Sequence, residues 1–326
     1  MRYLITGGAG FIGSHLAEAL IARGDDIVAL DNLATGSAAN IERLTGDRSF
    51  RFVEGSVTDA AVVEDLVEQC DVVVHLAAAA GVKLVVKHPM HTLRTNIVGT
   101  EVVLEAAHRS RRKTLVASSS EVYGKNSGTM SETTDRVVGP PSISRWAFSE
   151  SKAVDEFLAL GYAKEHGLDV VIVRFFNTVG PRQNGAFGYV VPRLVAQALL
   201  GRDLEIYGDG TQTRCFCDVS DSVRAVIELL DRSDVAGEIF NVGSDEEISI
   251  RDLARLIVGI TQTSSALRTV PYEEAYGSGY EDIPRRVPDT TKIRTRIGWS
   301  PVHDLEAIIK RTIAYAVEVG PETLLV

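Results

Sequence analysis

Residues 6–14 read Thr6-Gly7-Gly8-Ala9-Gly10-Phe11-Ile12-Gly13-Ser14 and join an apolar run of strand length, residues 3–6, to a segment with helical spacing of its apolar residues. A turn of this kind lets the backbone approach a pyrophosphate, and the start of the helix presents free N–H groups to it. Asp31 ends the next apolar run 18 residues after Gly13, where a carboxylate can accept hydrogen bonds from ribose hydroxyls. A glycine-rich turn without a ligand is the alternative, and the position of Asp31 argues against it. The stretch therefore predicts a dinucleotide site.

Strand-length runs alternate with helical patterns through the first half of the chain. The runs are residues 3–6, 27–31, 50–54, 72–76 and 115–119, and the helical patterns are residues 14–22, 60–68 and 92–108. Such alternation is typical of an α/β fold, a doubly wound parallel (Rossmann) sheet that binds ligands outside the carboxyl ends of its strands. Residues 170–175 are predicted to form a further strand.

The pattern becomes looser and richer in turns after residue 175. We expect residues 1–175 to form the dinucleotide-binding domain and residues 176–326 to form mainly a smaller, loop-rich substrate domain over a cleft. Residues 215–245 contain a helix pattern and a strand pattern that we expect to rejoin the large sheet.

The residues around Asp31 also select the cofactor. Its carboxylate would repel a 2′-phosphate, and no arginine lies in residues 32–37 to neutralise one. NAD is therefore predicted rather than NADP. His75, at the end of the fourth predicted strand, is interpreted as a packed residue and not as a catalyst.

Composition and charge exclude several classes of protein. The 326 residues carry 34 Lys and Arg against 44 Asp and Glu, a net charge of -10, which argues against binding to nucleic acid. Cys70, Cys215 and Cys217 fit neither a disulfide framework nor a metal site, so buried thiols are expected and no metal is predicted. The sequence has no apolar run of membrane-spanning length and no room for a signal peptide before the first strand. A cytoplasmic protein is expected.

Several motifs together closely resemble those of the extended short-chain dehydrogenases, the NAD-dependent epimerases and dehydratases that act on nucleotide sugars. The motifs are Gly7-x-x-Gly10-x-x-Gly13, Asp31, residues 75–78, Asn96, residues 118–124, Lys152, residues 174–182, residues 207–214 and residues 286–289. The resemblance covers nearly the whole chain. It implies NAD as cofactor, a UDP-sugar as substrate, and a homodimer formed through residues 92–108 and 147–163.

The resemblance also implies roles for single residues. Ser119 resembles the hydroxyl that binds the sugar C4 oxygen, and Lys152 resembles the lysine that holds the nicotinamide ribose and lowers the pKa of the acid/base residue. The expected substrate contacts are Asn177, Val191, Arg214 and Arg286, the two arginines as a diphosphate clamp. The expected cofactor contacts are Gly7, Gly10, Phe11, Ile12, Gly13, Asp31, Asn32, Thr35, Gly36, Ser56, Val57, Leu76, Ala77, Ala78, Asn96 and Lys152.

Phe148 departs from the family at the most important position. The family has a tyrosine four residues before the lysine, and its phenolate takes the C4 proton, a contribution of about 10²–10⁴ in rate. Phenylalanine has no such group. Either the proton leaves through Ser119, Glu121, Tyr123 or water, or the chain is a variant made inactive to trap ligands.

A second departure is the pair Ser120 and Glu121. Sugar-nucleotide 4,6-dehydratases have Asp-Glu here, whereas 4-epimerases lack the glutamate. A 4-keto sugar has an acidic C5 proton that Glu121 could remove, and without an acid at residue 120 the hydride is expected to return to C4. Such chemistry resembles the UDP-N-acetylglucosamine 5,6-dehydratases of antibiotic biosynthesis. We therefore expect a lyase that makes a 5,6-ene sugar nucleotide. A UDP-hexose 4-epimerase and a catalytically disabled NAD-binding protein are the alternatives.

Overall fold

The computed structural model describes residues 1–277 and 280–325. Its centre is a seven-stranded sheet in the order β12-β7-β5-β4-β1-β2-β3, and neighbouring strands are parallel throughout. The strands are β1 (Arg2–Thr6), β2 (Asp26–Asp31), β3 (Phe50–Glu54), β4 (Val72–His75), β5 (Lys113–Ser119), β7 (Val170–Phe175) and β12 (Ile239–Val242). This confirms the predicted doubly wound parallel fold.

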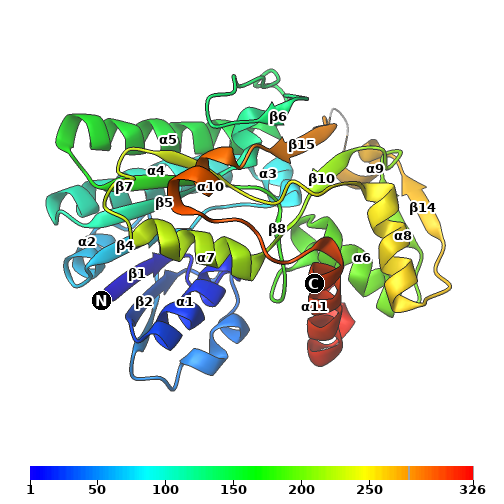
Figure 1. The fold of residues 1–326 in the computed structure, drawn as a ribbon, viewed down its shortest axis with the longest axis horizontal. Coiled ribbons are helices and arrows are strands. Elements are labelled where there is room, and N and C mark those ends of the chain that lie inside the picture. Colours follow the sequence, from blue (N-terminus) through cyan, green and yellow to red (C-terminus); the bar gives the residue numbers. More distant parts are fainter. Residues whose placement is uncertain (278–279, 326) are drawn as a thin grey trace.

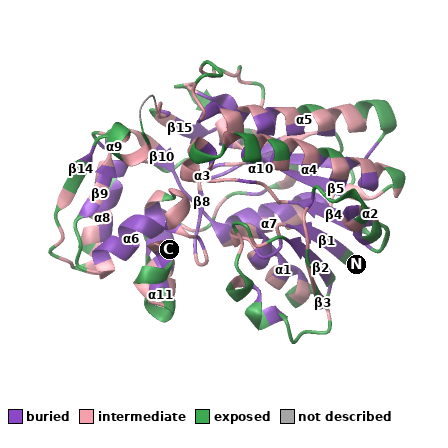
Figure 2. Cartoon of the chain, turned by 180° about the vertical axis from the view of Figure 1, so that it is seen from behind, coloured by how far each residue is buried: buried purple, intermediate pink, exposed green. Residues whose placement is uncertain are grey.

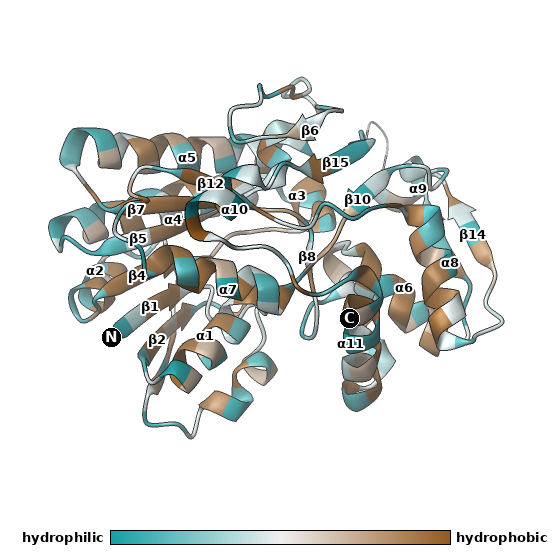
Figure 3. Cartoon of the chain, viewed as in Figure 1, coloured by the Kyte–Doolittle hydropathy of each residue, from teal (hydrophilic) through white to brown (hydrophobic). Residues whose placement is uncertain are grey.

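Helices cover both faces of this sheet (Figures 1 and 2). The helices α1 (Phe11–Arg23) and α7 (Val219–Leu230) bury residues such as Leu16 and Val223 against one face. On the other face lie α2 (Ala60–Glu68), α4 (Pro89–Arg109) and α5 (Trp146–His166), which share a second apolar core. A sheet covered on both faces needs strands that are apolar throughout, and Figure 3 shows the central strands as the most hydrophobic elements.

Two helices begin earlier than their apolar patterns predicted. The helix expected over residues 14–22 starts at Phe11, because Gly10 is already its N-cap. The helix expected over residues 92–108 starts at Pro89. Proline lacks a backbone N–H and has a fixed φ, so it suits the first turn of a helix, where no intrahelical partner is needed.

The smaller part of the molecule follows β7 and has a separate apolar core. Its four-stranded sheet has the order β13-β10-β15-β6, in which β6 comes from the chain before β7, and β11 with β8 and β14 with β9 form two-stranded sheets. The strands outside the large sheet are β6 (Thr129–Met130), β8 (Thr178–Val179), β9 (Leu204–Tyr207), β10 (Thr213–Cys215), β11 (Cys217–Asp218), β13 (Glu247–Ser249), β14 (Leu267–Val270) and β15 (Arg285–Pro288). The remaining helices are α3 (Val82–Lys87), α6 (Val190–Leu199), α8 (Ile250–Thr261), α9 (Tyr272–Tyr276), α10 (Thr291–Ile297) and α11 (Leu305–Val319).

The chain crosses between the two parts more than once. After β11 it returns to the large layer, where α7 packs beside α1 and β12 pairs with β7. Short 3-10 helices occupy several connections, at Ala38–Asn40, Glu42–Leu44, Ser120–Tyr123, Gly185–Phe187 and Pro321–Leu325. These crossings hold the carboxyl edge of the large sheet against the smaller part.

All three cysteines are buried and free, as the sequence predicted. Burial raises the pKa of Cys70 to about 11, and the thiols of Cys215 and Cys217 are shifted upward by burial in the same way. None of them is therefore a reactive thiolate at neutral pH. No helix in the described part of the chain is long and apolar enough to cross a membrane.

Candidate active site

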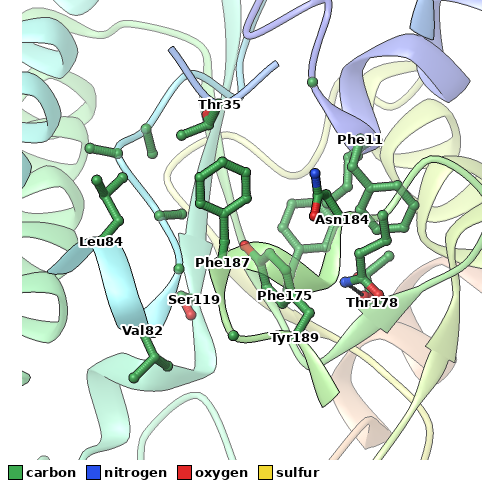
Figure 4. A pocket seen from close by; sticks show the side chains of 18 of the residues that line it. Phe11, Thr35, Val82, Leu84, Ser119, Phe175, Thr178, Asn184, Phe187 and Tyr189 are labelled. Carbon is green, nitrogen blue, oxygen red and sulfur yellow. Dashed lines mark hydrogen bonds between the residues drawn. The ribbon is translucent and has the colours of Figure 1, made fainter. Parts of the chain in front are cut away.

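A cleft of about 870 Å³ lies over the carboxyl ends of the central strands. One end is walled by the glycine-rich turn after β1, and the other by arginine and tyrosine side chains of the smaller part. Figure 4 shows the rings of Phe187 and Tyr189 between the wall that carries Ser119 and the wall that carries Phe11. Among the described residues, no group of three or more His, Cys, Asp and Glu side chains could hold a metal ion.

Two glycines of the glycine-rich turn, Gly7 and Gly13, lie too close to neighbouring backbone to carry a side chain. A Cβ atom on Gly7 would lie 2.8 Å from the Ala77 nitrogen, and one on Gly13 would lie 2.2 Å from the Gly7 carbonyl oxygen. Gly7 also has a φ of +72°, which glycine adopts without strain. Gly10 is the N-cap of α1, and no side chain caps that helix. The bare N-terminus of α1 can therefore receive the pyrophosphate of a dinucleotide.

Asp31 ends β2 and lines the cleft. Its carboxylate accepts hydrogen bonds from the backbone nitrogens of Ala9, at 3.0 Å, and Leu33, at 2.8 Å. Burial raises the pKa of Asp31, and these backbone donors oppose that shift. Neither lysine nor arginine is present among the residues between 30 and 40 that line the cleft. A ribose with free hydroxyls fits this site, and a 2′-phosphate does not.

The structure brings nearly all of the predicted cofactor contacts to the cleft, and Ser56 and Asn96 are the exceptions. The Ser56 hydroxyl bonds to the hydroxyl of Thr58 instead. Asn96 is fully buried behind the wall, where it accepts from the Ala79 nitrogen and donates to Ser151 Oγ. Asn96 therefore shapes the loop that follows β4 from behind.

The predicted catalytic residues converge at the end of β5. Ser119, Ser120, Glu121, Phe148 and Lys152 all line the cleft. Ser119 is the N-cap of the 3-10 helix Ser120–Tyr123, and its Oγ accepts from the Glu121 nitrogen at 3.2 Å. This turn of helix points the Glu121 side chain toward the smaller part.

Glu121 is held by two arginines that come from distant parts of the chain. Arg145 Nη2 lies 3.3 and 3.2 Å from the two carboxylate oxygens, and Arg286 Nη2 lies 2.6 Å from Oε1. Burial opposes ionisation of Glu121, but the charges of Arg145, Arg286 and Arg214 outweigh it and hold the pKa below its ordinary value. Glu121 is therefore an ionised and weak base.

A second carboxylate completes this group of charges. Arg214 Nη2 donates to Asp282 Oδ1 at 3.0 Å, and Arg145 Nη1 donates to the Tyr280 hydroxyl at 2.6 Å. Arg214 and Arg286 are register neighbours on β10 and β15. Three arginines thus face two carboxylates, which leaves one formal positive charge at this end of the cleft.

The sequence analysis did not identify Arg145, Asp282 or the tyrosines around them. Tyr276 and Tyr280 are stacked, with ring centroids 4.2 Å apart, and Tyr207 contacts Tyr276 edge-on. No motif signals these residues, although the recurrence of tyrosine in the segment before Arg286 was visible. The predicted substrate contacts Asn177 and Val191 also line the cleft, and Asn177 Nδ2 donates to the Cys215 carbonyl.

Tyr123 is not available to carry a proton from a substrate. Its hydroxyl donates to Asn241 Oδ1 at 2.7 Å and accepts from Arg174 Nη1 at 2.8 Å. The side chain is fully buried outside the cleft, and burial raises its pKa to about 12. The expectation that Tyr123 could replace the missing phenol is therefore wrong. Ser119, Glu121 and water remain, and both side chains line the cleft.

Lys152 lies one turn after Phe148 on α5. Its Nζ donates to the Ala117 carbonyl at 2.9 Å and to Asp155 Oδ2 at 3.0 Å. Behind it, His75 is buried between the hydroxyls of Thr6 and Thr100, as expected for a packed histidine. Burial, followed by the charge of Lys152, lowers the pKa of His75 to about 3, so its ring is neutral.

Comparison with known proteins places this geometry in a family. The family described as "NAD dependent epimerase/dehydratase family" matches residues 3–243. A UDP-N-acetyl-alpha-D-glucosaminuronate decarboxylase of Bacillus cytotoxicus is 44% identical over 319 residues, which are 98% of each chain. A UDP-glucuronic acid decarboxylase of Danio rerio is 35% identical over 324 residues, which cover 96% of this chain and 72% of that protein.

Among solved structures, the UDP-glucuronic acid 4-epimerase of Bacillus cereus, in complex with UDP-glucuronic acid and NAD, is similar with a TM-score of 0.87. It is 29% identical, and the match covers 98% of this chain and 100% of that chain. A tyrosine-to-phenylalanine mutant of the same epimerase holds NAD and UDP-4-deoxy-4-fluoro-glucuronic acid. NAD is therefore the cofactor of this chain.

Replacing Gly13 by alanine is expected to weaken NAD binding by about tenfold or more, or about 1.4 kcal/mol. The new Cβ would lie 2.2 Å from the Gly7 carbonyl oxygen, so α1 would move away from the turn that receives the pyrophosphate. Isothermal titration calorimetry measures the change. Gly161→Ala is the matched control, because nothing lies within 4 Å of a Cβ at that helical position. An unchanged NAD affinity in folded Gly13→Ala would contradict the expected contact.

Proposed function

This chain belongs to the NAD-dependent epimerase/dehydratase family. Within that family, we propose that it is a decarboxylase of a UDP-hexuronic acid, with UDP-N-acetylglucosaminuronic acid as its substrate. It is an NAD-dependent enzyme of nucleotide-sugar metabolism. The observation that carries the finer proposal is the end-to-end match, at 44% identity, to a decarboxylase of that name. The arginines around Glu121 support it, because a guanidinium group suits a substrate carboxylate.

Loss of carbon dioxide follows simply from oxidation at C4. The glycine turn and Asp31 would hold NAD, which would supply an acceptor for the hydride of the sugar C4 and a donor for its return. The C6 carboxylate is then β to the C4 ketone, so the C5–C6 bond breaks and its electron pair forms an enolate across C5 and C4. C5 next takes a proton from water or from a residue of the cleft. No step in this sequence requires a base that removes the C5 proton.

The state of Glu121 favours decarboxylation over the expected 5,6-dehydration. Dehydration starts with removal of the C5 proton, and Glu121 is the carboxylate expected to remove it. Two guanidinium groups bind Glu121, and its lowered pKa makes it a poor proton acceptor. The two similar sequences described above, from Bacillus cytotoxicus and Danio rerio, are named as decarboxylases and not as 5,6-dehydratases. In the decarboxylase, Glu121 instead orients Arg145 and Arg286.

Phe148 leaves the C4 proton without the usual phenol. Ser119 lies at the end of β5 in the cleft, so its hydroxyl can pass that proton to water. The side chain of Lys152 stays on the cofactor side, held by Ala117 and Asp155. The diphosphate role of Arg214 and Arg286 remains a proposal, because both guanidinium groups bond to carboxylates of the protein.

The test is to incubate the protein with NAD and UDP-N-acetylglucosaminuronic acid in deuterated buffer and to follow the products by mass spectrometry and NMR. We expect loss of carbon dioxide and one deuterium at C5. Parallel samples with UDP-N-acetylglucosamine test the other reactions, since water loss indicates a dehydratase and inversion at C4 with unchanged mass indicates an epimerase. A Phe148→Tyr sample is run alongside. If both forms leave every sugar unchanged, the decarboxylase proposal is wrong and the site is disabled.

Arg145→Gln is expected to weaken binding of UDP-N-acetylglucosaminuronic acid by about 10–100-fold, the range for a lost charged hydrogen bond. Binding of UDP-N-acetylglucosamine should change much less, because that sugar has no C6 carboxylate. Calorimetry with NADH in place of NAD measures both affinities without turnover. Arg285→Gln is the matched control, since Arg285 sits beside Arg286 on β15 but pairs with Glu247. Equal losses for the two sugars would refute a carboxylate-binding role.

We also propose that the protein is a homodimer that pairs through α4 and α5. Phe157 on α5 and Met90 on α4 expose 70% and 75% of their surface, which is unusual for large apolar side chains. Phe157→Glu is expected to shift the sedimentation coefficient to that of a monomer. Val317→Glu on α11, where Val317 is 66% exposed, should leave it unchanged. A wild-type protein that sediments as a monomer would rule the dimer out.

A further inference from the structure

Asp155 is a fully buried carboxylate that the reaction proposed above does not use. It lies one turn after Lys152 on α5, and its Oδ2 accepts from Lys152 Nζ at 3.0 Å. The same ammonium group donates to the Ala117 carbonyl, so two of its three protons are already committed inside the protein. A carboxylate is costly to bury, and an arrangement that buries one beneath the lysine of the active site needs a physical reason.

The groups around Asp155 leave Lys152 as its counter-ion. His75, which also contacts Thr100, is neutral, and its two nitrogens are occupied by Thr6 and Thr100. The Thr100 hydroxyl lowers the pKa of Asp155 and so favours its charged form. Of the two carboxylate oxygens, Oδ1 has no partner at hydrogen-bond distance. The pKa of Asp155 is raised overall, because burial outweighs the opposing effect of the Lys152 charge.

The neighbouring acid does not share this lysine. Glu156 is the other acid that faces Asp155, and its carboxylate binds Arg174 at 2.8 and 2.6 Å. Glu156 also accepts from Ser118 Oγ. The buried acids therefore form two separate pairs, one with Arg174 and one with Lys152.

A counter-ion on Lys152 weakens the electric field of its ammonium group at the side chain four residues earlier on α5. In a site with a tyrosine four residues earlier, the uncompensated ammonium lowers the pKa of the phenol. A carboxylate at 3.0 Å cancels much of that field. In this chain the residue four positions before Lys152 is Phe148, which has no ionisable proton. A weaker field therefore changes no pKa at that position.

We propose that Asp155 is a positioning residue for Lys152 and that it neutralises the charge which would otherwise act on a side chain at position 148. Asp155 holds the ammonium against Ala117 on the cofactor side and cancels the charge that a phenol at position 148 would need. Lys152 then serves to bind and not to assist proton transfer. The inference goes beyond the proposed function, because it does not depend on which reaction follows oxidation at C4.

The test measures the pKa of the phenol that Phe148→Tyr introduces. In that single variant we expect a phenol pKa near or above the ordinary value of about 10. In Phe148→Tyr/Asp155→Asn the ammonium is no longer neutralised, so the pKa should fall by about 1–3 units. NMR of protein with 13C-labelled tyrosine and bound NAD identifies the new resonance by difference from the unmodified chain and follows its titration.

The control is Phe148→Tyr/Glu150→Gln, which removes a carboxylate from the same helix that pairs with Arg136 outside the cleft. It should titrate like the single variant. Equal phenol pKa values with and without Asp155 would overturn the proposal, as would an equal shift in the control. If the double variant does not fold, the single variant still decides, because a phenol pKa well below the ordinary value with Asp155 present contradicts the neutralisation.

The same samples separate this inference from the proposed function. If the phenol pKa falls on loss of Asp155 and no variant decarboxylates UDP-N-acetylglucosaminuronic acid, the neutralisation stands and the decarboxylase proposal fails. If decarboxylation occurs and the phenol pKa does not respond to Asp155, the neutralisation fails and the decarboxylase proposal stands.

Discussion

Buried pairs of opposite charge lie between the end of β5, the start of α5 and the smaller part, and they fix the geometry of that half of the active site. A charge in the protein interior is too costly without a partner. Glu121 has Arg145 and Arg286, Arg214 has Asp282, and Lys152 has Asp155. The pair of Glu121 with Arg286 joins the end of β5 to β15, and so ties the smaller part to the edge of the large sheet. The cleft is shaped by these pairs as much as by its apolar walls.

Local features of the sequence were enough to predict the fold and the cofactor. The glycine turn, Asp31 and the alternation of strand and helix patterns describe short-range constraints, and the parallel sheet follows from them. The residues that the sequence analysis missed act over long separations. Arg145 meets Glu121 from 24 residues away, and no spacing rule connects the two. Arg286 was predicted as a diphosphate contact, but its bond to Glu121, 165 residues away, was not. Ser56 and Asn96 show the opposite failure, because a motif position does not reveal that a side chain has a partner within the protein.

The side chains around Phe148 show which groups could replace the missing phenol and which could not. Tyr123 cannot replace it, since that hydroxyl is held by Asn241 and Arg174 behind the cleft. The lysine of this site has a counter-ion, because Lys152 Nζ lies 3.0 Å from Asp155 Oδ2. A paired ammonium exerts a weaker field on its surroundings than a free one. Phe148 has no ionisable group on which that field would act.

Decarboxylation and dehydration place opposite demands on Glu121. A dehydratase needs this carboxylate to gain a proton from C5, so its environment should raise the pKa toward neutrality. A decarboxylase needs no proton acceptor there, because carbon dioxide leaves with its bonding electrons left on the sugar. It needs positive charge that is held firmly enough to orient a uronate carboxylate. The two guanidinium groups on Glu121 lower its pKa and are themselves fixed by it, an arrangement that weakens the base and preorganises the cations. The electrostatics of the cleft thus favour the reaction in which the carbon–carbon bond, and not a C–H bond, is broken at C5.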